Sequence, residues 1–263
     1  HSRSPAIHAA FARQTGEDIA YERLGAEIGR FAETAERFFA QGGRGLNVTL
    51  PFKGQAYDFV DQVSERAREV GVVNTILIGP DGRRTGDNSD GCGLLRDLSV
   101  NHGLVLAGTR ILVLGAGGAA AGVLPPLLRA APLRLVLANR TVEKAVALAA
   151  RHAGLGPVRA VDLSELAECA PFDLVINATS AGIEGAAPAL PEALFSARAA
   201  AYDLFYAEAA TPFMEWAGGQ GVSRVWDGFG MLVEQAAESF YLWRGVRART
   251  REVIAALRPG EIG

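Results

Sequence analysis

The chain has 263 residues, of which 49% are apolar, so it can form one large domain or two ordinary ones with a full hydrophobic core. Its formal net charge of −3 argues against the strongly basic surface of a nucleic-acid-binding protein. Cys92 and Cys169 lie far apart and indicate reduced thiols in a cytoplasmic protein. The histidines show no metal-ligand spacing and no signal peptide is recognisable, so we predict no metal site and no membrane partner.

Local signals predict an α/β organisation in the first hundred residues. Ser4 as an N-cap and Pro5 in the first turn favour a helix start, and Pro80-Asp81-Gly82 favours the turn of a hairpin. In chain order, the expected elements are a helix from Ser4, a strand over 20–24, a helix over 31–40, a strand over 45–50, a helix over 62–70, a hairpin over 73–88 and a helix over 91–103.

Residues 109–227 alternate apolar strands with helical runs, which is typical of a doubly wound parallel sheet. The expected strands are ILVLG, LRLVLA, VRAV, DLVINA, AAYDLF and SRVWD. Amphipathic helices follow over 230–245 and 248–257, and we expect them to return to the first domain. The predicted fold is therefore α/β with two domains: an N-terminal α/β substrate domain formed by 1–98 and 229–263, and a Rossmann domain formed by 99–228. Substrate is expected in the cleft between them.

A glycine-rich turn at 111–120 matches the dinucleotide fingerprint G-x-G-x-x-G/A through Gly115, Gly117 and Ala120. The match alone is a weak signal, because small residues also form turns in other α/β domains. It gains weight from the strand before it and the helix after it, since a helix N-terminus attracts the charge of a pyrophosphate.

The stretch over 111–128 carries no charge, but its glycines and prolines and its flanking arginines argue against a membrane span. Pro125 and Pro126 fall where the helix after the glycine turn should continue. Because an interior proline costs about 3 kcal/mol, we expect a kink or an early helix end there.

Asn139, Arg140 and Thr141 stand at the end of the next strand, where an NAD-binding domain usually carries an acidic residue for the ribose 2′-hydroxyl. One of the three is cationic and none is acidic. A guanidinium suits a 2′-phosphate, so the predicted cofactor is NADP(H).

Lysine is rare in this chain, with two lysines among 26 basic residues. Lys144 lies on a charged helical run, where a solvated face explains it. Lys53 follows an apolar strand, where solvation explains it less well. Unlike arginine, lysine can release its proton near neutral pH, so Lys53 is a candidate for proton transfer.

Polar residues interrupt the apolar segments of the first domain in separate clusters. Each has an ordinary explanation as a cap, a turn or a strand residue. Together their hydroxyls and amides match the vicinal hydroxyls of a small polyol, and Lys53 with Asp90 could share the proton that alcohol–ketone redox requires. The clusters are Ser2 and Ser4; Asn47, Thr49 and Lys53; Asn74 and Thr75; Asn88, Ser89 and Asp90; with Gln235 from a later helix.

These motifs resemble the shikimate dehydrogenase family almost from end to end. The family's patterns HSxSP, NVTxPxK, AVNT, GxNTDG, GAGGA, NRT, NATSxG, YDxxY and DGxxMLxxQA match residues 1–5, 47–53, 72–75, 86–91, 115–119, 139–141, 177–182, 202–206 and 227–236. The resemblance implies reversible NADPH-dependent reduction of 3-dehydroshikimate to shikimate in aromatic amino-acid biosynthesis. It also implies a small-molecule substrate, no nucleic-acid partner, and a monomer or homodimer.

The resemblance assigns roles by matched position. The implied catalytic pair is Lys53 and Asp90. The implied substrate-binding residues are Ser2, Ser4, Thr49, Lys53, Asn74, Asp90, Tyr206 and Gln235. The implied cofactor-binding residues are Gly115, Ala116, Gly117, Gly118 and Ala119 at the pyrophosphate, Asn139, Arg140 and Thr141 at the 2′-phosphate, and Thr179, Gly228 and Met231 near the nicotinamide.

Two departures from the family pattern matter. The family has a strand before HSxSP that this chain lacks, so we expect an unpaired sheet edge in the substrate domain. Ser89 replaces the family's threonine, which predicts a slightly roomier pocket. A quinate or aminoshikimate dehydrogenase of broader range therefore remains an alternative, and a non-catalytic sensor of a shikimate-like ligand is a second one.

Overall fold

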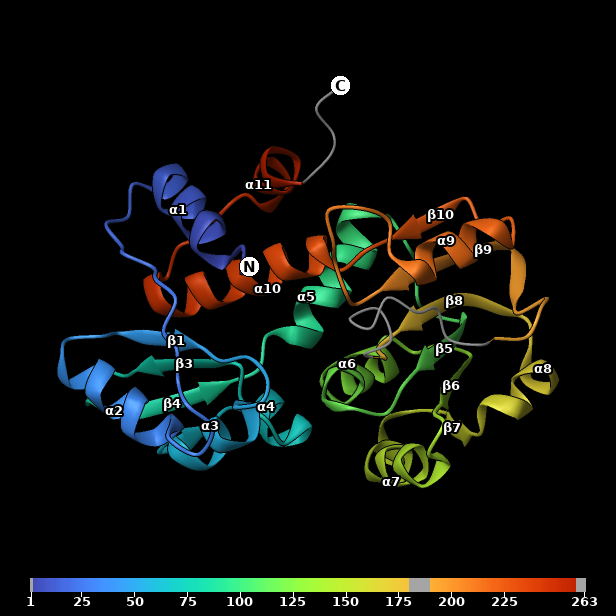
Figure 1. Ribbon diagram of the computed structural model, residues 1–263, viewed down its shortest axis with the longest axis horizontal. Coiled ribbons are helices and arrows are strands. Elements are labelled where there is room, and N and C mark those ends of the chain that lie inside the picture. The colour runs from blue at the N-terminus through green and yellow to red at the C-terminus, as the bar shows by residue number, and fades with distance from the viewer. Residues whose placement is uncertain (1, 180–189, 259–263) are drawn as a thin grey trace. The chain divides into compact units, whose positions relative to one another are not determined.

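The computed structural model describes residues 2–179 and 190–258, which divide into two compact units (Figure 1). Unit 1 contains residues 2–93 and 232–257, and unit 2 contains residues 94–179, 190–231 and Arg258. The chain therefore leaves unit 1 once and returns to it through a late helix. No helix in these described ranges combines the length and apolar character that crossing a membrane requires.

Unit 1 contains a mixed four-stranded sheet in the order β1-β3-β4-β2. Strands β3 and β4 form the predicted antiparallel hairpin, and Gly82 supplies the positive φ of 77° that its turn requires. Helices α2, α3 and α4 bury Ala35, Ala56 and Ala67 against Ile76 of the sheet. The elements are α2 (Phe31–Ala40), β1 (Gly45–Asn47), α3 (Lys53–Phe59), β2 (Gln62–Val63), α4 (Glu65–Val70), β3 (Thr75–Ile78) and β4 (Arg84–Asp87).

Further helices of unit 1 come from both ends of the chain. Helix α1 (Ser4–Thr15) packs against α11 (Thr250–Leu257), and Phe11 meets Phe240 of α10 (Phe229–Arg244) edge to face. Helix α5 (Asp90–Arg96) starts in unit 1 and leads into unit 2 through a π-helical turn, Asp97–Asn101. These helices bring residues distant in sequence to one sheet.

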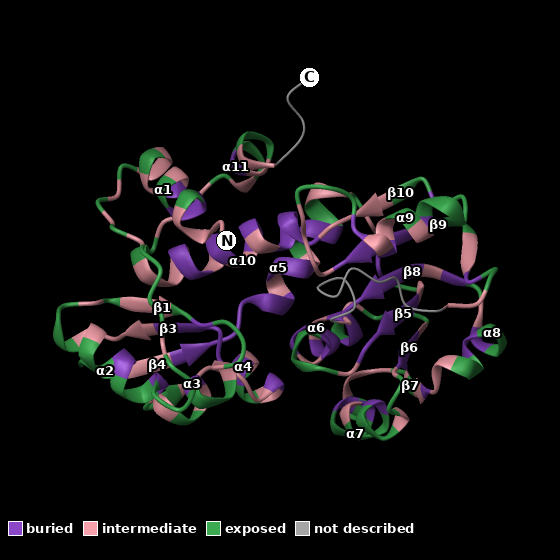
Figure 2. Cartoon of the chain, viewed as in Figure 1, coloured by how far each residue is buried: buried purple, intermediate pink, exposed green. Residues whose placement is uncertain are grey.

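Unit 2 contains a fully parallel six-stranded sheet in the order β10-β9-β8-β5-β6-β7, as a Rossmann fold requires. Alternate residues of β5 face opposite layers: Ile111 and Val113 pack with α6 and α7, and Leu112 and Leu114 pack with α8 and α9. The central strands are accordingly almost wholly buried (Figure 2). The elements are β5 (Arg110–Leu114), α6 (Gly118–Arg129), β6 (Arg134–Ala138), α7 (Val142–His152), β7 (Val158–Val161), α8 (Leu166–Cys169), β8 (Phe172–Asn177), β9 (Phe195–Asp203), α9 (Pro212–Gly219) and β10 (Arg224–Trp226).

The structure corrects several local expectations. No strand forms over 20–24, because a strand needs a hydrogen-bonded neighbour and this segment pairs with none of β1 to β4. The strand expected over 45–50 ends at Asn47, and the helix expected over 62–70 is preceded by the short β2. Helix α3 was not predicted. Ser4 is the first residue of α1 and not its cap.

The prolines after the glycine turn do not end the helix early, since α6 continues to Arg129 with Pro125 and Pro126 inside it. Val123, Leu124 and Leu127 of the same helix are fully buried against the sheet. Burial of this apolar face offsets the local cost of two missing backbone donors.

Candidate active site

The predicted catalytic pair is assembled in unit 1. Lys53 is the first residue of α3, Asp90 is the first residue of α5, and Lys53 Nζ lies 2.6 Å from Asp90 Oδ2. The two side chains are only 19% and 6% exposed, so little water competes with this ion pair. The Asn88 side chain accepts the amide of Asp90 at 3.1 Å and fixes the turn that leads into α5.

Asn74 is the centre of the surrounding hydrogen-bond network. Its Nδ2 donates to Asp90 Oδ1 at 2.8 Å and to Gln235 Oε1 at 3.3 Å. Its Oδ1 accepts the backbone amide of Ser89 at 2.9 Å. Asn74 is 3% exposed and its amide is thus held in one orientation by three segments of the chain. The structure therefore brings together Lys53, Asn74, Asp90 and Gln235.

A second layer supports Asn74 from β1 and α10. Thr75 Oγ1 donates to Asn74 Oδ1 at 2.9 Å, and Asn47 Nδ2 donates to Thr75 Oγ1 and to Ser239 Oγ at 3.1 and 2.8 Å. Tyr21 donates its hydroxyl to Asn47 at 2.9 Å. Sequence reasoning missed Tyr21 and Ser239, because neither lies in a polar cluster of its own.

Three other predicted substrate residues of unit 1 lie outside the group of Lys53, Asn74, Asp90 and Gln235, and of these Ser4 interacts with the hydroxyl of Tyr21. Ser2 and Ser4 flank the start of α1, where Ser2 Oγ accepts the Ser4 amide at 3.3 Å. Thr49 is exposed after β1, and its carbonyl accepts the amide of Phe52. Tyr206 belongs to unit 2, where its ring meets Phe229 edge to face. His1 of the predicted HSxSP motif lies outside the described residues.

The predicted pyrophosphate turn occupies the carboxyl end of β5 in unit 2. Gly115 has φ +97°, and a Cβ there would lie 3.0 Å from the carbonyl oxygen of Ala178. Gly117 is the N-cap of α6, and a Cβ there would meet nothing within 4 Å. Ala116, Gly118 and Ala119 complete the turn and the start of the helix. The backbone conformation of the turn thus requires glycine at position 115, and the absence of a side chain at position 117 leaves open space at the start of α6.

The loop after β6 is joined to this turn by Asn139. Its Oδ1 accepts the amide of Ala116 at 3.1 Å, and its Nδ2 donates to the carbonyl of Thr141 at 2.8 Å. Arg140 and Thr141 are exposed beside it. The side chain of Asn139 therefore fixes the loop that presents the Arg140 guanidinium.

The other predicted cofactor residues follow neighbouring strands of the same sheet. Thr179 donates its hydroxyl to Asn177 Oδ1 at 2.7 Å after β8. Gly228 packs so closely on the carbonyl of Leu204 that a Cβ would lie 2.2 Å from its oxygen. Met231 is buried in the first turn of α10. Residues 180–182 of the predicted NATSxG motif lie outside the described residues.

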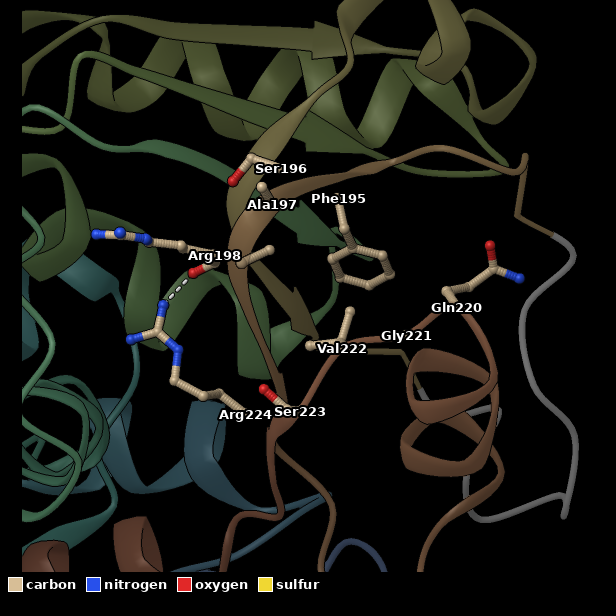
Figure 3. Close-up of a pocket in the computed structure, with 10 residues that line it drawn as sticks. Phe195, Ser196, Ala197, Arg198, Gln220, Gly221, Val222, Ser223 and Arg224 are labelled. Atoms are coloured by element: carbon tan, nitrogen blue, oxygen red, sulfur yellow. Dashed lines mark hydrogen bonds between the residues drawn. The ribbon is translucent and has the colours of Figure 1, made fainter.

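Unit 2 also has a cavity of about 430 Å³ at the amino ends of two strands, whereas the glycine turn lies at the carboxyl end of β5 (Figure 3). Phe195, Arg198, Val222 and Arg224 line it, at the start of β9 and β10. None of the predicted site residues contributes to it. In parallel sheets ligands bind beyond the carboxyl ends of the strands, so this cavity is not the dinucleotide site.

Three family models match the chain in sequence order. Residues 1–76 match the shikimate dehydrogenase substrate binding domain, residues 99–184 match the shikimate / quinate 5-dehydrogenase model, and residues 228–258 match the shikimate 5′-dehydrogenase C-terminal domain. The matches fall in both structural units.

Individual proteins resemble the chain over nearly its whole length. The shikimate dehydrogenase (NADP(+)) of Halorhodospira halophila is 56% identical over 99% of this chain and 95% of its own. An Ael1 enzyme from Pseudomonas putida superposes with a TM-score of 0.93 at 42% identity, covering 99% of this chain and 95% of that one. The shikimate 5-dehydrogenase of Thermus thermophilus, solved in complex with NADP(H) and shikimate, has a TM-score of 0.84 at 36% identity, covering 97% and 94%.

Proposed function

The chain belongs to the shikimate dehydrogenase family, and we propose that Lys53 and Asp90 transfer the proton in its reaction. That reaction is the reversible NADPH-dependent reduction of 3-dehydroshikimate to shikimate, an oxidoreductase step of the shikimate pathway. The observation that carries the proposal is the 2.6 Å contact between Lys53 Nζ and Asp90 Oδ2. This contact joins a proton donor and a proton acceptor, which is what a hydroxyl that gains or loses its proton during the reaction requires.

The hydrogen-bond network of unit 1 suits a small ring with several hydroxyls. Asn74, Asp90 and Gln235 offer amide donors and carbonyl or carboxylate acceptors, while Lys53 offers a charged donor. Because these side chains already hold one another, they need little reordering when substrate replaces some of the contacts. We therefore assign substrate binding to unit 1, with Ser2, Ser4 and Thr49 as further contacts.

The residues of unit 2 fit NADP(H). Open space before Gly117 at the N-terminus of α6 lets the backbone approach a pyrophosphate. The loop after β6 carries Arg140 and no carboxylate, which favours the 2′-phosphate of NADP(H) over the 2′-hydroxyl of NAD(H). When bound, the nicotinamide supplies or accepts the hydride.

The proton is handled by residues of the chain itself. In the reductive direction Lys53 Nζ donates a proton to the carbonyl oxygen as it becomes a hydroxyl, and Asp90 stabilises the cationic amine beforehand. In the oxidative direction the same pair accepts that proton. Asn74 keeps the Asp90 carboxylate turned toward Lys53 by donating to its second oxygen.

We further propose a cytoplasmic protein that is a monomer or a homodimer. Cys92 and Cys169 are free thiols and form no disulfide with each other, which agrees with a reducing compartment. The substrate is a small molecule, and no nucleic acid is needed.

The decisive experiment compares initial rates of oxidation of shikimate and quinate, each with NADP⁺ and with NAD⁺. Shikimate with NADP⁺ should be the fastest pair by a wide margin. Comparable rates with quinate or NAD⁺ would replace the assignment with a dehydrogenase of broader range. Shikimate binding without turnover would favour a sensor.

A further inference from the structure

A cluster of ion pairs lies next to the candidate site of unit 1 and is not used by the mechanism. Arg66 of α4 is its centre. Its Nε donates to Asp87 Oδ1 at 2.6 Å, its Nη2 contacts Asp87 Oδ2, and the same Nη2 donates to Glu238 Oε1 of α10 at 3.1 Å. One guanidinium thus joins α4, the end of β4 and α10.

We propose that Arg66 is a positioning residue for the catalytic pair and acts through Asp87 and Glu238. This inference rests on the proposed function, because it concerns the geometry of Lys53 and Asp90 during turnover.

The first step of the argument is the position of Asp87. This residue ends β4 and directly precedes the turn that carries Asp90. Its Oδ1 accepts the backbone amide of Asn88 at 2.8 Å and the hydroxyl of Ser64 at 2.6 Å. Holding the Asp87 carboxylate therefore fixes the backbone from which Asp90 projects.

The second step concerns Asn74. The backbone carbonyl of Asp87 accepts the amide of Asn74 at 3.0 Å, and Asn74 in turn donates to Asp90. A displacement of Asp87 would move the catalytic carboxylate and the amide that orients it at the same time.

The third step concerns the α10 arm. Glu238 lies three residues after Gln235, which places both on neighbouring turns of one helix face. Gln235 accepts from Asn74, and Arg247 donates to Glu238 Oε2 at 2.7 Å. Arg66 therefore fixes α10 relative to the turn that carries Asp90. As a result, the two acceptors of the Asn74 amide, Asp90 and Gln235, keep their positions relative to each other.

Charge burial explains why this arrangement depends on arginine. Asp87 is 4% exposed, and burial raises the pKa of its carboxyl, but the Arg66 guanidinium and the Ser64 hydroxyl outweigh burial and hold that pKa below its usual range. A planar guanidinium can hold Asp87 at two atoms while also reaching Glu238, which a lysine ammonium cannot do with the same geometry.

The test uses Arg66→Ala and Arg66→Lys, with Arg84→Ala as the matched control. Arg84 of β4 makes a similar two-atom pair with Asp61, the residue before β2, at 3.0 and 3.1 Å, but neither residue contacts the catalytic network. We expect Arg66→Ala to lower kcat for shikimate oxidation by about tenfold or more without changing the Kd of NADP⁺. Arg66→Lys should recover part of kcat, and Arg84→Ala should leave kcat within about twofold.

A double substitution separates positioning from loss of stability. Arg66→Ala is made both in the wild type and in the Asp90→Asn variant. If Arg66 acts through Asp90, Arg66→Ala should lower the kcat of the Asp90→Asn variant by a much smaller factor than it lowers the kcat of the wild type. Equal kcat losses in Arg66→Ala and Arg84→Ala, or full additivity with Asp90→Asn, would overturn the inference while leaving the function intact. If the wild-type chain does not oxidise shikimate, the proposed function fails and this inference fails with it.

Discussion

The two units build their candidate sites in opposite ways. In unit 1 the site consists of side chains from distant segments, such as Lys53, Asp90 and Gln235, held by charge and hydrogen bonds. In unit 2 it consists mainly of backbone: a left-handed glycine at Gly115 and a helix N-terminus at Gly117, with Asn139 as a support. The first site should therefore be sensitive to lost or neutralised side chains, and the second to added atoms.

The largest effect should come from Lys53. Replacing it with alanine removes the amine that we propose moves the proton, so kcat should fall by about a hundred- to ten-thousand-fold while the Kd of NADP⁺ stays the same. Lys144→Ala is the matched control, because the other lysine of the chain is exposed on α7 of the cofactor unit. Steady-state rates and a cofactor titration measure both quantities. A Lys53→Ala protein that retained most of its kcat would remove Lys53 from the mechanism.

The stability of unit 1 should also depend on pH through His8. Its ring is fully buried and stacked on Tyr21 at 4.1 Å. Burial lowers the pKa of His8 from 6.5 to about 4, partly offset by Asn47. Between pH 4 and 6.5 the unfolded chain binds a proton at His8 that the folded chain does not. The free energy of unfolding therefore has its full value with respect to His8 above pH 6.5, and it falls by roughly 3 kcal/mol as the pH drops to 4.

Buried carboxylates change stability over the same range, so the measurement compares two proteins. Denaturant unfolding gives the free energy of unfolding of the wild type and of His8→Phe at each pH. The difference between the two free energies should change between pH 7 and pH 4 and should be constant above pH 7. Parallel curves would show that His8 does not titrate in this way. Burial raises the pKa of the neighbouring Tyr21 to about 12, so that residue stays neutral throughout.

The contrast between the units also explains what the sequence could predict. The glycine turn and the strand before it are local patterns, and the structure has them at the predicted positions. Helix α2 was predicted over 31–40, and it runs from Phe31 to Ala40. Lys53 and Asp90 were paired by their chemistry and by the family pattern, since nothing in their 37-residue separation implies contact.

Long-range partners were beyond prediction from one sequence. Arg66 and Glu238 are 172 positions apart, and each also fits the solvated face of its own helix. The strand expected over 20–24 is wrong for a related reason, because the residues of a segment do not show whether a neighbouring strand is there to pair with it. The predicted roles of the individual site residues stay predictions until they are tested.

Arg140 provides a test of the cofactor unit that involves a side chain. Because hydrogen bonds to charged groups contribute about 1.5–3 kcal/mol, Arg140→Ala should raise the KM for NADPH roughly 10- to 100-fold. The KM for NADH should change little, since NADH has no 2′-phosphate. Equal weakening of both cofactors would contradict the assignment, and Arg151→Ala, on the exposed end of α7, controls for loss of a nearby positive charge.

The smallest and most specific effect separates two glycines of one turn. Gly115→Ala places a Cβ at φ +97° and 3.0 Å from the Ala178 oxygen, so unit 2 should lose about 1–2 kcal/mol of stability. Gly117→Ala has room for its Cβ and an extended backbone, so stability should stay nearly unchanged. That Cβ would instead occupy the space that the pyrophosphate must approach, and NADPH affinity should fall. Unfolding curves and cofactor titrations of both variants measure the two effects separately. If Gly117→Ala bound NADPH as tightly as the wild type, the pyrophosphate would lie elsewhere and the backbone-built description of this site would be wrong.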